Sequence, residues 1–102
     1  MNRGDIYWYE DQDTKSRPFL VLTRSTAIPV LRRLLAAPIT STIRGIASEV
    51  RLTVSDGLPR ECVISFDNVR LIERERLRDH ITTLSVARLA EVCEAFNFAV
   101  DC

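Results

Sequence analysis

Residues 17–23 read RPFLVLT, and this stretch decides the fold. Its apolar part is nearly continuous, which is typical of a strand buried on both faces. A second run, LLAAPIT at 34–40, has the same character. If the two runs pair as a symmetric antiparallel hairpin centred on Ile28–Pro29, position 17 lies opposite position 40. The pattern therefore predicts that Arg17 and Thr40 share one rim of a sheet.

The rest of the chain predicts more short strands and one helix. We expect strands at 6–9, 19–23, 34–40, 49–54, 62–66 and 69–72, with a turn at Asp67-Asn68 between the last two. From Ser85 onwards, apolar residues recur every three or four positions, which predicts an amphipathic helix with Ser85 as its N-cap. The predicted apolar face consists of Val86, Leu89, Val92, Cys93, Phe96, Ala99 and Val100. The expected fold class is mainly β, a small antiparallel barrel closed by a C-terminal α-helix.

Length and composition indicate an ordinary globular protein. The 102 residues suit a single domain, which we place at 1–102. No apolar run approaches the ~18 residues of a membrane span, and the N-terminus has charges where a signal peptide needs apolar residues. The cysteines, Cys62, Cys93 and Cys102, are odd in number and lack CxxC spacing, so they predict neither a disulfide framework nor a zinc site. We expect a cytoplasmic protein without a metal or other cofactor.

Charge is unevenly distributed although the formal net charge is zero. Residues 14–48 contain six basic residues and no acidic residue. Nearly all basic residues of the chain are arginines, and a guanidinium binds phosphate through two hydrogen bonds. The basic segment is therefore a candidate phosphate-binding surface, with a merely solvated face as the equally strong alternative.

The available residue types exclude several chemistries. His80 is the single histidine, so a histidine-rich metal site is excluded, and there is no glycine-rich phosphate loop or GxSxG motif. What remains is arginine with hydroxyl groups at the ends of two predicted strands. The residues concerned are Ser16, Arg17, Thr40, Ser41 and Thr42, with Lys15 and Arg44 nearby. Such a rim can hold the oxygens of a phosphodiester and stabilise charge on them; a plain polar turn is the competing interpretation.

Several segments, in this order and at these spacings, also resemble a known family. They are RGDIYW (3–8), RPFLVLT (17–23), APITSTIRG (37–45), SEVRL (48–52), GL (57–58), CVISFDNVRLI (62–72) and LRDHITTLS with the helix that follows it (77–99). Together they resemble the MazF/PemK family of toxins from type II toxin–antitoxin pairs. The resemblance implies an SH3-like β-barrel of the MazF/PemK/CcdB kind, usually as a homodimer.

The resemblance also implies an activity and a partner. The activity is a metal-independent endoribonuclease that cuts single-stranded RNA at short sequences and leaves 2′,3′-cyclic phosphate and 5′-hydroxyl ends. The partner is a MazE-like antitoxin whose disordered tail lies in the active-site groove. By the resemblance, Arg17 and Thr40 are the catalytic pair. Since a guanidinium stays protonated and is a poor base, we expect Arg17 to stabilise the charged phosphorane and Thr40 to hold the phosphate.

Further RNA contacts are predicted from charge and from proximity to the motif. The candidates are Lys15, Ser16, Arg24, Ser41 and Arg44. Trp8 or Tyr9 is a candidate for base stacking, although alternation along the strand places one of the two in the core. The group that takes the proton of the 2′-hydroxyl is left open.

Two features keep alternatives open. The loop EDQDTKS (10–16) is shorter than in many relatives, and the glutamate that they place near the site has no clear counterpart, so we do not assign that role to Asp13. A non-catalytic toxin of the same fold that binds DNA gyrase is the main alternative, and a barrel that only binds RNA is another. The gyrase-binding relatives depend on the C-terminal helix, whereas the presence of Arg17 and Thr40 favours the ribonuclease.

Overall fold

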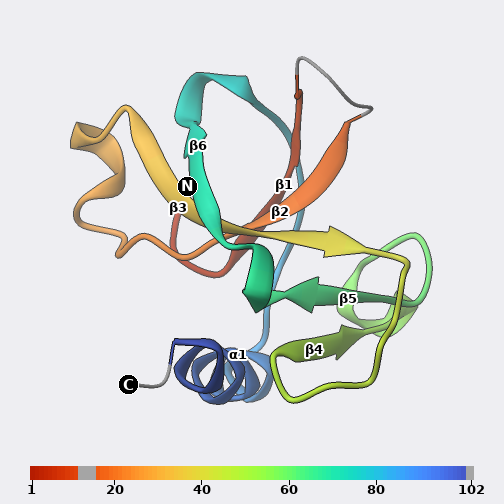
Figure 1. Cartoon of the computed structure of the whole chain (residues 1–102). Coiled ribbons are helices and arrows are strands. Elements are labelled where there is room, and N and C mark those ends of the chain that lie inside the picture. The colour runs from red at the N-terminus through yellow and green to blue at the C-terminus, as the bar shows by residue number, and fades with distance from the viewer. Residues whose placement is uncertain (12–15, 101–102) are drawn as a thin grey trace.

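The computed structural model describes residues 1–11 and 16–100, and it is mainly β with one α-helix (Figure 1). The strands are β1 (Asp5–Tyr9), β2 (Arg17–Val21), β3 (Arg33–Thr40), β4 (Glu49–Leu52), β5 (Cys62–Ser65), β6 (Arg70–Glu73) and β7 (Leu77–Thr83). The helix α1 spans Val86–Ala99, and the 3₁₀ turns are η1 (Ile28–Val30), η2 (Val54–Asp56), η3 (Phe66–Asn68) and η4 (Arg74–Arg76). No helix in the described ranges is long and apolar enough to cross a membrane.

Strand β3 is the centre of the sheet. The order is β4-β5-β3-β2-β1-β7, and β6 pairs with β3 outside this path. The first half of β3 pairs with β6, from Arg33 to Ala36, and its last two residues pair with β5. Thr40 is opposite Val63 of β5, and Pro38 is opposite Phe19 of β2. The end of β3 therefore lies between β5 and β2.

The register between β2 and β3 is the one that the sequence predicts. Phe19 pairs with Pro38, and Val21 pairs with Ala36. Both pairs have the same midpoint as positions 17 and 40, so the same register places Arg17 opposite Thr40. The two catalytic candidates, 23 positions apart in the sequence, therefore meet at one rim.

Other expectations need correction. The closed barrel is not confirmed, because β4 and β7 end the strand order and no ladder joins them among the described strands. The turn at Asp67-Asn68 is present as η3, but β5 and β6 pair with β3 and not with each other. Residues 54–56 form η2 instead of continuing β4. The strand pattern missed β7 because LRDHITT is polar and none of its residues is buried.

The main core lies between the sheet and α1, which Figure 1 shows beside β4. Ile6, Leu20 and Val92 belong to this buried cluster. Ser85 caps the helix as predicted, because its hydroxyl accepts a hydrogen bond of 3.2 Å from the backbone N–H of Arg88. The predicted helix face is partly wrong. Val86, Cys93 and Val100 are exposed, and Ala95 is buried in their place.

The loop after β4 is hydrogen-bonded to α1 and packs closely against β7. Arg88 donates two hydrogen bonds to Asp56, from Nε to Oδ1 at 3.0 Å and from Nη2 to Oδ2 at 3.1 Å. These bonds are the main reason why the pKa of the Asp56 carboxyl lies below its usual value. Gly57 has a φ of +100°, and a Cβ there would lie 2.6 Å from Oγ1 of Thr82. The anchored loop continues to Arg60, so these contacts also fix one wall of the hollow described below.

Gly57→Ala should destabilise the fold more than Gly45→Ala. Both glycines have positive φ, where a Cβ costs about 1–2 kcal/mol. Only the Gly57 Cβ would collide with Thr82, since nothing lies within 4 Å of a Cβ at Gly45. That crowding should add about 1–3 kcal/mol. Urea unfolding of the two variants measures the difference, and equal losses would show that contact with Thr82 does not limit the loop.

Arg88→Ala should lower the free energy of unfolding by about 1 kcal/mol at pH 7, and the loss should fade in acid. The pKa of Asp56 is lowered from 3.8 in the folded state, so the ion pair stabilises fully above that value and is lost as pH falls through the folded pKa. Arg51→Ala is the control, because Arg51 and Glu61 pair at 2.7 Å through side chains that are 60% and 56% exposed. If the free energies of unfolding of wild type and Arg88→Ala differ as much at pH 2.5 as at pH 7, this account is contradicted.

Candidate active site

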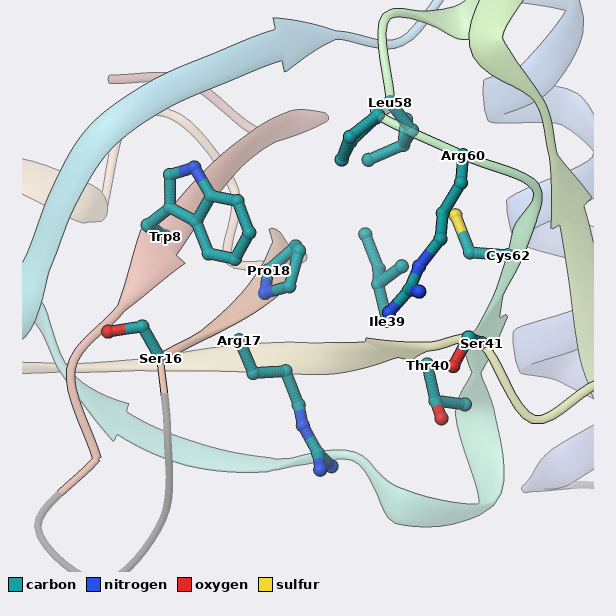
Figure 2. A pocket seen from close by; sticks show the side chains of 11 residues that line it. Trp8, Ser16, Arg17, Pro18, Ile39, Thr40, Ser41, Leu58, Arg60 and Cys62 are labelled. Carbon is teal, nitrogen blue, oxygen red and sulfur yellow. The ribbon is translucent and has the colours of Figure 1, made fainter.

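The start of β2 and the end of β3 form a rim that carries Arg17 and Thr40. Figure 2 shows both side chains extending to the same side of the β3 ribbon. Arg17 is exposed, and its guanidinium has no ion pair or hydrogen bond within the described ranges. Oγ1 of Thr40 accepts a hydrogen bond of 3.2 Å from the backbone N–H of Thr42, which leaves its own O–H to donate. The rim therefore offers an uncompensated cation next to a hydroxyl donor.

Arg17 lies where three hollows of the described surface meet. The first, of about 280 Å³, also contains Trp8 and Arg60 (Figure 2). The second, of about 210 Å³, lies beyond Thr40 and contains Arg44. The third, of about 280 Å³, lies between Arg17 and Arg70. An extended ligand bound at Arg17 therefore has space on more than one side.

Most of the predicted RNA contacts lie at these hollows. Ser16 and Ser41 line the first hollow, and Arg44 lines the second. Arg24 follows β2 at the end opposite Arg17 and lines none of the three, so its contact with RNA stays a prediction. Lys15 lies outside the described residues.

The two aromatic candidates separate as strand alternation predicts. Tyr9 is buried, and its ring meets that of Phe19 edge to face with the centroids 5.2 Å apart. Trp8 is half-buried and lines the first hollow. Trp8 is therefore the aromatic that a ligand can reach.

Arg70 is close to Arg17 but is bound to its neighbours. Its Nη2 lies 2.8 Å from Oδ2 of Asp11, and its guanidinium lies 5.1 Å from the centroid of the Phe19 ring. A guanidinium with an ion pair and an aromatic contact has less to gain from a new anion than one without partners. Of the two guanidiniums, that of Arg17 is therefore the more available to a new anion.

Sequence reasoning missed Glu49 and Arg60. Oε1 of Glu49 accepts hydrogen bonds of 3.0 Å from the backbone N–H groups of both Arg44 and Gly45, and Glu49 lines the second hollow with Arg17. It therefore shapes the loop that follows Thr40. Arg60 comes from the anchored loop after β4. Glu49 lies in the SEVRL segment but was not singled out there, and nothing in the sequence distinguishes Arg60 from the other arginines.

Other reactive groups have little part in the site. Burial is the main cause that raises the pKa of the Cys62 thiol, so this thiol in the first hollow stays protonated near neutral pH and is a poor nucleophile. His80 lies on β7, where its ring contacts Tyr7 at 5.2 Å and its Nε2 lies 3.0 Å from Oγ1 of Thr83. The described residues include no group of three or more metal-ligating side chains.

Comparison with known proteins decides the family. Residues 2–100 match the model of the PemK-like, MazF-like toxins of type II toxin–antitoxin systems. The chain belongs to this family. The MazF/PemK resemblance of the sequence motifs is thereby confirmed, and the Arg17–Thr40 rim lies within the matched region.

MazF-like relatives match over almost the whole chain. A probable endoribonuclease MazF5 of Mycobacterium tuberculosis is 43% identical over 101 residues, covering 98% of this chain and 93% of the relative. A probable endoribonuclease MazF2 of the same species is 37% identical over 103 residues, covering all of both chains.

Solved MazF structures have the same fold. The toxin MazF-mt6 of Mycobacterium tuberculosis superposes with a TM-score of 0.88 at 35% identity, over 95% of this chain and 96% of that one. A crystal structure of MazE-MazF from Deinococcus radiodurans gives a TM-score of 0.83 at 25% identity, over 100% and 97% of the two chains.

Glu49 should act by positioning and not by its charge. Glu49→Gln keeps an oxygen that accepts from the N–H groups of Arg44 and Gly45, so RNA cleavage should stay within about threefold of wild type. Glu49→Ala leaves both N–H groups without their acceptor and should lower cleavage by about tenfold or more. Initial rates on one RNA measure both. Suppose that Glu49→Gln is as impaired as Glu49→Ala, and that its cleavage rate no longer falls with the wild-type rate as the pH is lowered. Glu49 then acts as a base instead.

Proposed function

We propose that this MazF-like toxin is an endoribonuclease that cuts single-stranded RNA without a metal ion and leaves 2′,3′-cyclic phosphate and 5′-hydroxyl ends. The observation that carries the proposal is the opposition of Arg17 and Thr40 at a rim between hollows, which the β2–β3 register imposes. Relatives that are 43% and 37% identical are named probable endoribonucleases. The proposed catalytic pair and RNA contacts rest on this geometry and on the family resemblance.

The proposed reaction uses the 2′-hydroxyl of RNA as the nucleophile. Its oxygen gives up its proton and attacks the adjacent phosphorus, and the bond to the 5′-oxygen breaks. The 5′-oxygen takes up a proton to become the 5′-hydroxyl, and a 2′,3′-cyclic phosphate remains. DNA lacks this hydroxyl and is not cut. The guanidinium of Arg17 binds the non-bridging oxygens and stabilises the negative charge that builds on the phosphorane. Thr40 donates its O–H to the same phosphate and orients it for attack.

The surrounding contacts then extend along the strand. Ser16 and Ser41 are placed to bind the substrate beside the scissile phosphate, and Arg44 to bind it in the second hollow. Lys15 and Arg24 are proposed for more distant parts of a longer RNA. Single-stranded RNA suits the site because its backbone carries a charge at every nucleotide.

The proposed protein partners are a MazE-like antitoxin and a second copy of this chain. MazE-MazF is the assembly named for the solved Deinococcus radiodurans structure. Uncompensated cations at the rim suit a disordered antitoxin tail that carries carboxylates. Val86 and Phe98 of α1, 86% and 60% exposed, are apolar surface available to a second copy.

The domain bounds, the barrel shape and the location of the protein belong to the same proposal. We take residues 1–102 as one toxin domain. We describe its shape as an SH3-like barrel, supported by the pairing of β3 with β2, β5 and β6. A cytoplasmic location is supported by the free thiols of Cys62 and Cys93.

A gyrase-binding toxin has less support. Such a function needs an accessible binding surface on the C-terminal helix, yet Phe96 is stacked on Phe66 at 5.8 Å and only Phe98 of the described helix aromatics is exposed. Gyrase binding would also leave the uncompensated Arg17 without a role. Unimpaired DNA supercoiling by gyrase in the presence of the protein is the expected result.

Purified protein in EDTA should cut single-stranded RNA into fragments with cyclic phosphate ends. Arg17→Ala should lower the rate by roughly 10²–10³, the usual effect of losing one donor to a charged transition state. Arg33→Ala is the control, because Arg33 is an exposed arginine at the opposite end of β3 from Thr40. Intact RNA would reject the proposed activity, whereas full cleavage by Arg17→Ala would reject only the proposed site.

A further inference from the structure

The first hollow reaches the face of the sheet opposite to that of Arg17. Trp8 pairs with Pro18, while the next pair along the ladder joins Tyr9 with Arg17. Side chains of successive residues in a strand point to opposite faces. Figure 2 accordingly shows Trp8 and Pro18 across the β3 ribbon from the Arg17 guanidinium. A strand of RNA bound at the rim can therefore place an adjacent nucleotide on this second face.

The second face provides a hollow with apolar groups along part of its wall. The rings of Trp8 and Pro18 and the side chain of Leu58 line the hollow, with Ile39 also in its wall (Figure 2). Its volume of about 280 Å³ is close to the lower limit of about 300 Å³ for small-ligand sites. A space of this size suits one planar group, and an aromatic surface stacks well on any nucleobase.

A cation reaches into the same hollow. Figure 2 shows the side chain of Arg60 extending from its loop towards Ile39 and Ser41. Arg60 is exposed and has no ion pair or hydrogen bond in the described part of the chain. Its neighbour Glu61 pairs with Arg51 instead, at 2.7 Å. The guanidinium of Arg60 is thus left for an anion brought by the ligand.

The loop that carries Arg60 is held in place. The Asp56–Arg88 ion pair anchors it to α1, and Gly57 packs closely against Thr82 of β7. A cation on an anchored loop loses less conformational entropy on binding than one on a free loop. This placement favours a specific contact over a merely solvated charge.

We propose that the first hollow is a nucleotide subsite, in which Trp8 stacks on the base next to the scissile phosphate and Arg60 binds the neighbouring phosphate of the same strand. The subsite rests on the proposed ribonuclease function and gives it a substrate preference: a stackable base and a charged phosphate are required beside the cut. Arg60 is a positioning residue, since it binds a phosphate that does not react. Its loss should therefore raise KM and spare kcat.

The first test measures binding of a short RNA that carries 2′-deoxyribose at the mapped cut site, so that it is not cleaved. Arg60→Met keeps the apolar stem and removes the charge. It should weaken binding and raise KM about tenfold, keep kcat within about threefold, and reduce the slope of log K against log salt by about 0.7. Arg33→Met, which removes an exposed arginine from a different hollow, should change none of these.

Trp8 supplies a second test in the unmutated protein, because it is the only tryptophan of the chain. The uncleavable RNA should quench Trp8 fluorescence on binding. The same RNA with an abasic nucleotide beside the cut site should bind more weakly and quench little at saturation.

The outcomes separate the subsite from the activity. If the wild type cleaves RNA but Arg60→Met binds as tightly as Arg33→Met, the subsite is rejected and the ribonuclease stands. Equal quenching by the abasic RNA would reject stacking by Trp8. If the wild type neither binds nor cleaves RNA, the proposed function itself fails, and the subsite fails with it.

Discussion

The pairing register of β2 with β3 is the constraint on which the candidate site depends. Phe19 opposite Pro38 fixes Arg17 opposite Thr40, and a slip of one residue would turn either side chain to the other face. β3 cannot slip easily, because β6 holds its first half and β5 its last residues. The buried side chains of β2 and β3 thus supply the energy that keeps the exposed Arg17 and the half-buried Thr40 together. The most hydrophobic part of the chain is what positions the chemistry.

Ion pairing explains how a chain of zero net charge presents a basic site. Several arginines outside the rim are neutralised by acidic partners; they include Arg51 with Glu61, Arg70 with Asp11, Arg78 with Glu10 and Arg88 with Asp56. Arg17 and Arg60 have no such partner within the described ranges. Arg17 lies in the segment without acids, so its isolation follows from the sequence. The isolation of Arg60 follows from the fold, because the adjacent Glu61 turns to Arg51.

Periodicity and symmetry were enough to predict the helix, most strands and the Arg17–Thr40 rim, since these depend on local pattern and on one hairpin. Long-range geometry was not accessible. β7 is polar and exposed, so it carries no apolar signal, and the pairing of both β5 and β6 with β3 replaces the simpler successive hairpins. Arg60 reaches the site because its loop folds back towards it, and Glu49, the first residue of β4, reaches it through hydrogen bonds from the backbone of Arg44 and Gly45. The family resemblance supplied the reaction, which no pattern of residues encodes by itself.

A double-mutant cycle on the rim tests most directly whether Arg17 and Thr40 act on one phosphate. Single-turnover RNA cleavage is measured for wild type, Arg17→Ala, Thr40→Val and the double variant, with each protein in excess of the RNA and above its dissociation constant. Groups that bind the same phosphate should be strongly coupled. The factor by which the double variant slows cleavage should therefore be smaller than the product of the two single factors, with a coupling energy of about 1 kcal/mol or more. Losses that multiply fully, with coupling below about 0.3 kcal/mol, would contradict a shared phosphate and the site built on it.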